Sequence, residues 1–132
     1  MTLHESIPVL GNFFHITYIE NSGMAFGINF SGGSLIFTVA AIVASVVVVW
    51  YLWKVRNRQF VLRLSLALIF GGAIGNLIDR LLFGRVVDFF DFSLAGYHWP
   101  IFNVADSAVT VGMFIFLYIS LFKQSALKQE FI

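Results

Sequence analysis

The stretch WPIFNVADSAVTVGMFIFLYISLF, residues 99–122, decides the fold of this chain. It is apolar and long enough to cross a membrane as a helix, which requires about 20 residues. It nevertheless carries Asn103 and Asp106, two polar side chains that hydrocarbon disfavours. An ionisable side chain inside a membrane span is costly to bury, so Asp106 is a candidate functional residue.

The composition predicts an integral membrane protein. Hydrophobic residues make up 59% of the 132 residues and charged residues only 11%, whereas a soluble domain carries about 25% charged residues. The net charge of +1 gives no indication of nucleic-acid binding. Because the chain has no cysteine, disulfides, thiolate metal sites and a cysteine nucleophile are excluded.

Three stretches are long and apolar enough to span a membrane: residues 34–53, 64–83 and 99–122. Basic residues are retained in cytoplasmic loops, and here they lie between the first two spans and after the third, at Lys54, Arg56, Arg58, Arg63, Lys123 and Lys128. Residues 1–33 and the loop of residues 84–98 are therefore expected on the outer side. We predict a single integral membrane domain over residues 1–132: an all-α bundle of three transmembrane helices with a small β-rich cradle outside.

Two segments outside the predicted spans indicate β structure. Residues 13–27, FFHITYIENSGMAFG, are rich in β-branched and aromatic residues, with alternation up to Tyr18 and a break at Asn21, Ser22 and Gly23. Residues 85–92, RVVDFFDF, indicate another short strand. Pro100 is expected to open the last helix in its first turn.

The polar residues of the second and third spans are predicted to lie at one depth. Asp79 and Asp106 each lie 16 residues from the cytoplasmic end of their span, which corresponds to about 24 Å at the rise of an α-helix. Asn103, Asp106 and Thr110 share one helix face because they are three and four residues apart. We expect this layer to form a wet cavity near the outer surface.

The second span carries a matching polar stripe. Gly72, Asn76 and Arg80 follow one another at a spacing of four residues, beside Gly71, Gly75 and Asp79. The glycines are expected to serve close helix packing. Arg80 has two interpretations, because its side chain could extend to the outer headgroups or contact a substrate.

Several chemistries can be compared for this layer. A serine–lysine dyad is excluded because every lysine lies on the cytoplasmic side, and a triad of Ser107 and His98 lacks a nucleophile-elbow sequence. A pair of carboxylates remains, in which one acid stays protonated and the other activates water. Asp88 and Asp91 are both available as partners of Asp106, and spacing alone does not choose between them.

Four stretches together resemble the motifs of the lipoprotein signal peptidase family, the bacterial signal peptidase II. They are NSGMAFG (21–27), GGAIGNLIDR (71–80), GRVVDFFDF (84–92) and WPIFNVADSAVTVG (99–112), in the order of the family. The resemblance implies a multi-pass aspartic endopeptidase of the bacterial inner membrane, with its active site facing the periplasm or cell exterior. Its substrates would be diacylglyceryl-modified prolipoproteins, from which it removes the signal peptide.

The resemblance also assigns residues. The catalytic pair falls on Asp88 and Asp106, which leaves Asp91 structural. The supporting or substrate-binding residues fall on Asn21, Asn76, Arg80 and Asn103. Membrane lipids and globomycin-type inhibitors are implied partners, nucleic acid is not, and neither a metal nor an organic cofactor is expected.

The chain departs from the family pattern in one respect. Family members begin with an additional span before the first motif, so three spans are expected here in place of four, with the N-terminus outside. This motivates an alternative hypothesis of a non-catalytic or truncated homologue that binds lipidated peptides or a partner without cleavage. A proton or ion pathway would need polar residues through the whole membrane depth, and the inner two-thirds of the spans contain essentially none.

Overall fold

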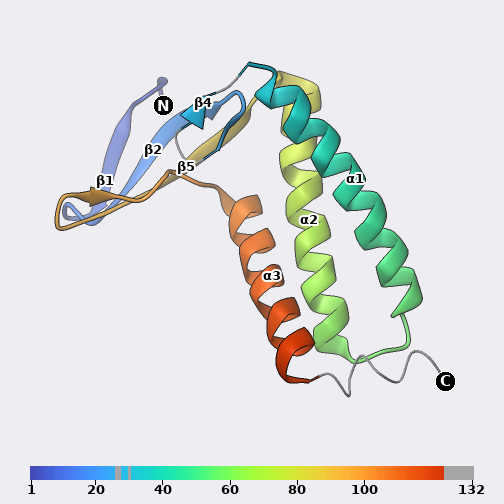
Figure 1. Cartoon of the computed structure of the whole chain (residues 1–132). Helices are drawn as coiled ribbons and strands as arrows, with labels where there is room; N and C mark the ends of the chain where they lie inside the picture. The colour runs from blue at the N-terminus through green and yellow to red at the C-terminus, as the bar shows by residue number, and fades with distance from the viewer. Residues whose placement is uncertain (26–27, 30, 124–132) are drawn as a thin grey trace.

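The computed structural model describes residues 1–25, 28–29 and 31–123, and consists of three long helices and a small antiparallel sheet (Figure 1). The helices are α1 (Gly33–Lys54), α2 (Phe60–Phe83) and α3 (Val104–Phe122). Each is long and apolar enough to cross a membrane, which confirms the predicted three-span bundle. Phe26, Gly27 and Lys128, which belong to the quoted motif and the predicted cytoplasmic tail, lie outside the described residues.

The prediction of a helix from residue 99 is wrong at its start, because α3 begins at Val104. Asn103 has an extended backbone, and its side chain accepts a hydrogen bond from the backbone N–H of Asp106. This arrangement ends the helix on its N-terminal side, because an asparagine cap satisfies an otherwise unpaired N–H group. Pro100 therefore precedes the helix and does not lie in its first turn. Helix α2 starts at Phe60, four residues before the predicted span.

The main sheet contains four strands in the order β1 (Ser6–Leu10), β2 (Phe14–Asn21), β5 (Val86–Leu94) and β6 (Tyr97–His98). All neighbouring strands are antiparallel. A separate hairpin is formed by β3 (Met24–Ala25) and β4 (Ile28–Asn29). The two predicted β segments are confirmed, whereas β1 was not predicted.

Helix α2 packs against both other helices, and glycines allow its close approach to α3. A Cβ atom at Gly72 would overlap the backbone oxygen of Ala105, and one at Gly112 would lie 2.6 Å from the backbone oxygen of Ser65. The packing role predicted for Gly72 is therefore confirmed. Gly71 differs, because a Cβ there would contact nothing within 4 Å. Gly112 is a packing glycine that the sequence analysis did not single out.

The sheet and the basic residues lie at opposite ends of the bundle. Figure 1 shows the sheet extending from the end where α1 begins and α2 finishes. Lys54 closes α1, Arg63 lies in the first turn of α2, and Lys123 follows α3, all at the other end. A small apolar core also lies there, formed by Val55, Leu62, Leu66 and Ile119. The molecule is thus polar at the sheet end and basic at the opposite end.

Candidate active site

Asp88 is the buried carboxylate at the sheet end of the bundle. It lies in strand β5, its side chain is only 4% exposed, and it faces the start of α3. The Asn103 side-chain amide donates a hydrogen bond to its Oδ1 at 2.9 Å, and the Asn21 amide donates to its Oδ2 at 3.3 Å. Three segments far apart in the sequence therefore meet at this carboxylate.

Asp106 is the second carboxylate, and it lies in the first turn of α3. Its Oδ1 accepts a hydrogen bond from the Asn76 side-chain amide of α2 at 2.8 Å. Its Oδ2 accepts from the backbone N–H of Asn103 at 3.1 Å, which completes a reciprocal capping box. The positive end of the helix dipole favours negative charge at this position.

Asn103 joins the two carboxylates. Its Oδ1 accepts from the Asp106 backbone N–H, which turns its Nδ2 toward Asp88. The same Nδ2 lies 3.0 Å from Oδ1 of Asn76 and 3.2 Å from the backbone oxygen of Val87. Because Asn103 is only 5% exposed, its amide orientation is set by these protein partners. One asparagine thus contacts the strand acid, the helix acid and the α2 amide.

The electrostatics of the pair favour one protonated acid. Burial, reinforced by the negative charge of Asp106, raises the pKa of Asp88 to about 6. Hydrogen bonds from Asn21 and Asn103 and the positive charge of Arg80 act in the opposite direction. Asp88 can therefore carry a proton close to neutral pH, as a general acid requires.

Comparisons with known proteins identify the family of this chain. The family model of signal peptidase (SPase) II matches residues 1–122. The chain belongs to the signal peptidase II family. It is 47% identical to a lipoprotein signal peptidase of Desulforapulum autotrophicum over 94% of this chain and 79% of the relative. It is 48% identical to that of Syntrophotalea carbinolica over 86% of this chain and 71% of the relative.

A solved bacterial membrane enzyme has the same fold as this family member. The two are 37% identical and superpose with a TM-score of 0.80 over 97% of this chain and 77% of the other. A second bacterial membrane enzyme structure gives the same TM-score of 0.80 at 36% identity. The chain is thus a bacterial membrane protein of a peptidase family.

A cavity lies beside Asn76 and Asn103, the hydrogen-bond partners of the two acids. Its volume is about 270 Å³, and its lining includes Asn76, Asp79, Val87 and Asn103. Of the two predicted helix stripes, Asn76 and Asn103 line this cavity, whereas Asp106, Arg80 and the exposed Thr110 do not, so the predicted polar cavity is confirmed only in part. The guanidinium of Arg80 lies 5.6 Å from the ring centre of Phe37 in α1, which holds it at the same end of the bundle.

Asp91 makes contacts that are separate from those of the pair. Its Oδ2 accepts a 2.6 Å hydrogen bond from Thr17, and its Oδ1 lies 4.0 Å from Nδ1 of His98. Ser107 donates its hydroxyl to the backbone oxygen of Asn103 at 3.1 Å, which is the local bond of a helix serine. In the part of the chain that the structure describes, no group of three or more acids and histidines could hold a metal ion.

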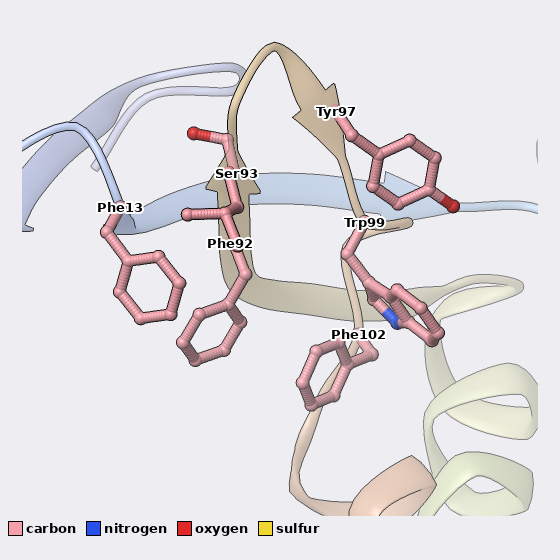
Figure 2. Close-up of a pocket in the computed structure, with 7 residues that line it drawn as sticks. Phe13, Phe92, Ser93, Tyr97, Trp99 and Phe102 are labelled. Carbon is pink, nitrogen blue, oxygen red and sulfur yellow. The ribbon is translucent and has the colours of Figure 1, made fainter.

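Mostly aromatic residues at the end of β5 and in the neighbouring segments line a second cavity. It measures about 430 Å³ and is lined by Phe13, Phe92, Ser93, Leu94, Tyr97, Trp99 and Phe102. Figure 2 shows the rings of Phe13, Phe92 and Phe102 projecting to the same side of the sheet. Phe92 lies four residues after Asp88 on β5, a separation of about 13 Å along a strand. The apolar cavity is therefore distinct from the polar one.

Proposed function

We propose that this chain is an aspartic endopeptidase that cleaves the signal peptide from diacylglyceryl-modified prolipoproteins, with Asp88 and Asp106 as the catalytic pair. The observation that carries the proposal is the double hydrogen bonding of Asn103. Its side-chain amide donates to Asp88 while its backbone N–H donates to Asp106. Two acids from a strand and a helix are thereby held within reach of one residue, as a shared water molecule and peptide bond would require.

The proposed reaction uses the acids in opposite protonation states. Asp106, in the ionised form, takes a proton from water while the water oxygen attacks the peptide carbonyl carbon. Asp88, in the protonated form, gives its proton to the carbonyl oxygen. As the tetrahedral intermediate collapses, the C–N bond breaks and the proton held by Asp106 passes to the leaving nitrogen. The ionised Asp88 takes back a proton from a hydroxyl of the intermediate as the carbonyl re-forms, so both acids return to their starting states. The raised pKa of Asp88 is consistent with its role as the acid.

The four supporting residues receive distinct roles in this proposal. Asn103 and Asn76 orient the pair through the hydrogen bonds described above, and Asn21 donates to Asp88 from strand β2. Arg80 contributes a positive charge near Asp88 and is available to a substrate backbone. Asp79 lines the cavity and is assigned no catalytic part.

We place the pair on the periplasmic or outer side of the bacterial inner membrane. The basic ends of the helices, at Lys54, Arg63 and Lys123, support a cytoplasmic position for the opposite end of the bundle. A lipid-anchored substrate would then meet the polar cavity at the outer leaflet. Surrounding membrane lipids and globomycin-type inhibitors are the other partners that we propose.

The proposal is tested by replacing each acid in the purified chain and assaying cleavage of a diacylglyceryl-modified prolipoprotein by gel mobility. Asp88→Asn and Asp106→Asn should each lower kcat by roughly 10²- to 10⁴-fold, the usual contribution of a general acid or base. Glu5→Gln is the matched control, because Glu5 is an exposed acid whose side chain bonds to Thr2 and pairs with the N-terminal amine, away from the two acids. Its activity should equal that of the unmodified chain.

Three outcomes separate the alternatives. Full activity of Asp88→Asn or Asp106→Asn would refute the assignment of the pair. Asp91→Asn should be tolerated much better than either, and an equal loss would count against Asp88 as the partner. Binding of globomycin by the unmodified chain without any cleavage would instead support a homologue that binds lipidated peptides and does not cut them.

A further inference from the structure

The pairing of β2 with β5 contains an irregularity close to the two acids. Ile16 pairs with Phe90 and Ile19 pairs with Asp88, so two residues, Thr17 and Tyr18, lie opposite the single residue Phe89. Such a bulge bends its strand and changes the direction of nearby side chains. Asp88 is the first paired residue beyond this bulge.

On its other edge, β5 is bonded to the segment that leads into α3. The backbone N–H groups of Phe89 and Phe90 both donate to the carbonyl of Phe102, at 3.0 and 2.8 Å, and Phe102 donates back to Phe90 at 3.2 Å. Asp88 directly precedes Phe89, and Asn103 directly follows Phe102. These bonds therefore set the separation between Asp88 and the asparagine that joins it to Asp106.

A chain of two hydroxyl groups, one on the exposed Ser6 and one on the buried Thr17, holds the bulge. Thr17 is 7% exposed, and its hydroxyl donates to Asp91 of β5 at 2.6 Å. A hydroxyl carries one hydrogen, so the 2.9 Å contact with Ser6 of β1 is a bond that Ser6 donates to Thr17. The chain of bonds runs across β1, β2 and β5, and it fixes the bulged residue to both of its neighbouring strands.

We infer that the Thr17–Asp91 hydrogen bond is a positioning device for the catalytic pair. It fixes the register of β2 on β5 at the bulge, and thereby the place of Asn21 beside Asp88. Thr17 and Asp91 act through these residues and do not contact the pair themselves. The inference rests on the proposed function and adds two positioning residues to it.

The test replaces the Thr17 hydroxyl by a methyl group and keeps the shape of the side chain. Thr17→Val is nearly isosteric and loses the bond, so kcat should fall roughly tenfold, because small misplacements of reacting groups cost that much or more. KM should stay within about twofold, since substrate contacts are unchanged. Thr17→Ser keeps the hydroxyl and should restore kcat to within about twofold of the unmodified chain.

A double-substitution cycle shows whether the two residues act together. Thr17→Val combined with Asp91→Ala should lower kcat no further than the more damaging single change, as expected for coupled residues. His98→Gln is the control, because His98 is largely exposed and lies 4.0 Å from the same carboxylate. Its kcat should be unchanged.

Two results would overturn the inference that Thr17 and Asp91 position the pair. Unchanged kcat in Thr17→Val, with only a lower unfolding temperature in detergent, would reduce the bond to fold stability and overturn the inference. Additive losses in the cycle would overturn it as well. Asp88→Asn is assayed alongside: if Asp88→Asn is inactive and Thr17→Val is normal, this inference alone fails, whereas an active Asp88→Asn removes the proposed function itself.

Discussion

Asn103 combines two tasks that proteins usually give to separate residues. It caps α3 through its Oδ1, and it contacts Asp88 through its Nδ2. A serine at this position would keep the first task and lose the second, because its single hydroxyl can accept from the helix but cannot reach in both directions. The two contributions can therefore be separated by substitution.

We predict that Asn103→Ser keeps the helix cap, since serine and asparagine are comparable caps, and loses about 1–3 kcal/mol of stability because the buried Asp88 carboxylate loses a hydrogen-bond donor. Its kcat should fall at least roughly tenfold, because the amide donor to Asp88 is lost. Asn103→Ala should lose activity and about 1 kcal/mol more stability than Asn103→Ser, because the cap is lost as well. Thermal unfolding in detergent and the cleavage assay measure the two effects separately. Normal kcat in Asn103→Ser would contradict the bridging role.

The raised pKa of Asp88 makes activity dependent on pH. Asp88 must carry a proton to act as the acid, and its pKa is about 6. The value of kcat/KM should therefore fall as the pH rises above about 6, approaching a tenfold loss per pH unit. Rates measured from pH 5 to 8 on protein that stays folded test this. A flat profile across that range would mean that Asp88 does not supply the proton.

The charge of Arg80 gives an independent test of the predicted dependence of kcat/KM on pH. Its positive charge lowers the pKa of Asp88 against the larger effect of burial. Removing the charge in Arg80→Gln should therefore raise the pKa of Asp88 and move the alkaline limb to higher pH. A shift to lower pH would show that Arg80 affects the pair by another route.

At the scale of elements, two adjacent glycines of α2 have opposite surroundings. Gly72 faces Ala105 and Val109 of α3 with no room for a Cβ, whereas Gly71 faces open space. Gly72→Ala should destabilise the bundle by roughly 1–3 kcal/mol, the usual cost of overpacking. Gly71→Ala should be neutral or slightly stabilising, because alanine is the better helix former. Thermal unfolding of the two variants tests the α2–α3 contact, and equal unfolding temperatures would contradict it.

The elements were predictable from the sequence to different degrees. The three spans follow from apolar length, and β2 and β5 follow from their β-branched and aromatic residues. The start of α3 was missed because Pro100 is an acceptable first residue of a helix, although Asn103 followed three residues later by Asp106 is a local capping-box pattern. The bulge at Thr17 was also missed, since regular alternation up to Tyr18 contains no sign of an extra residue.

The candidate site was predictable in part. Asp106 could be singled out because it lies in an apolar span, and its depth matched that of the polar stripe in α2. The choice of Asp88 over Asp91 came from the family resemblance, because both acids lie on one strand at a spacing of three. Their different partners depend on the folding of β2 and α3 against β5, which no local pattern encodes.

For the whole molecule, the separation of polar and basic ends predicts its orientation in the membrane. The chain has no cysteine, so single cysteines can be introduced as unique labels. Asn12→Cys, in the exposed turn between β1 and β2, should react with a membrane-impermeant maleimide in intact spheroplasts. Asn57→Cys, in the exposed α1–α2 connection, should react only after permeabilisation. The reverse pattern would place the acids on the cytoplasmic side.

The cap at Asn103 also has a consequence for biosynthesis. Asn21, Asn76 and Asp88 are translated before Asn103 and Asp106. The helix that carries Asp106 begins only where Asn103 closes its first turn. Helix α3 therefore completes the proposed pair, and a nascent chain that has inserted only α1 and α2 cannot yet bring the two acids together. Under the proposed function, hydrolytic capacity would appear only once α3 has joined α1 and α2.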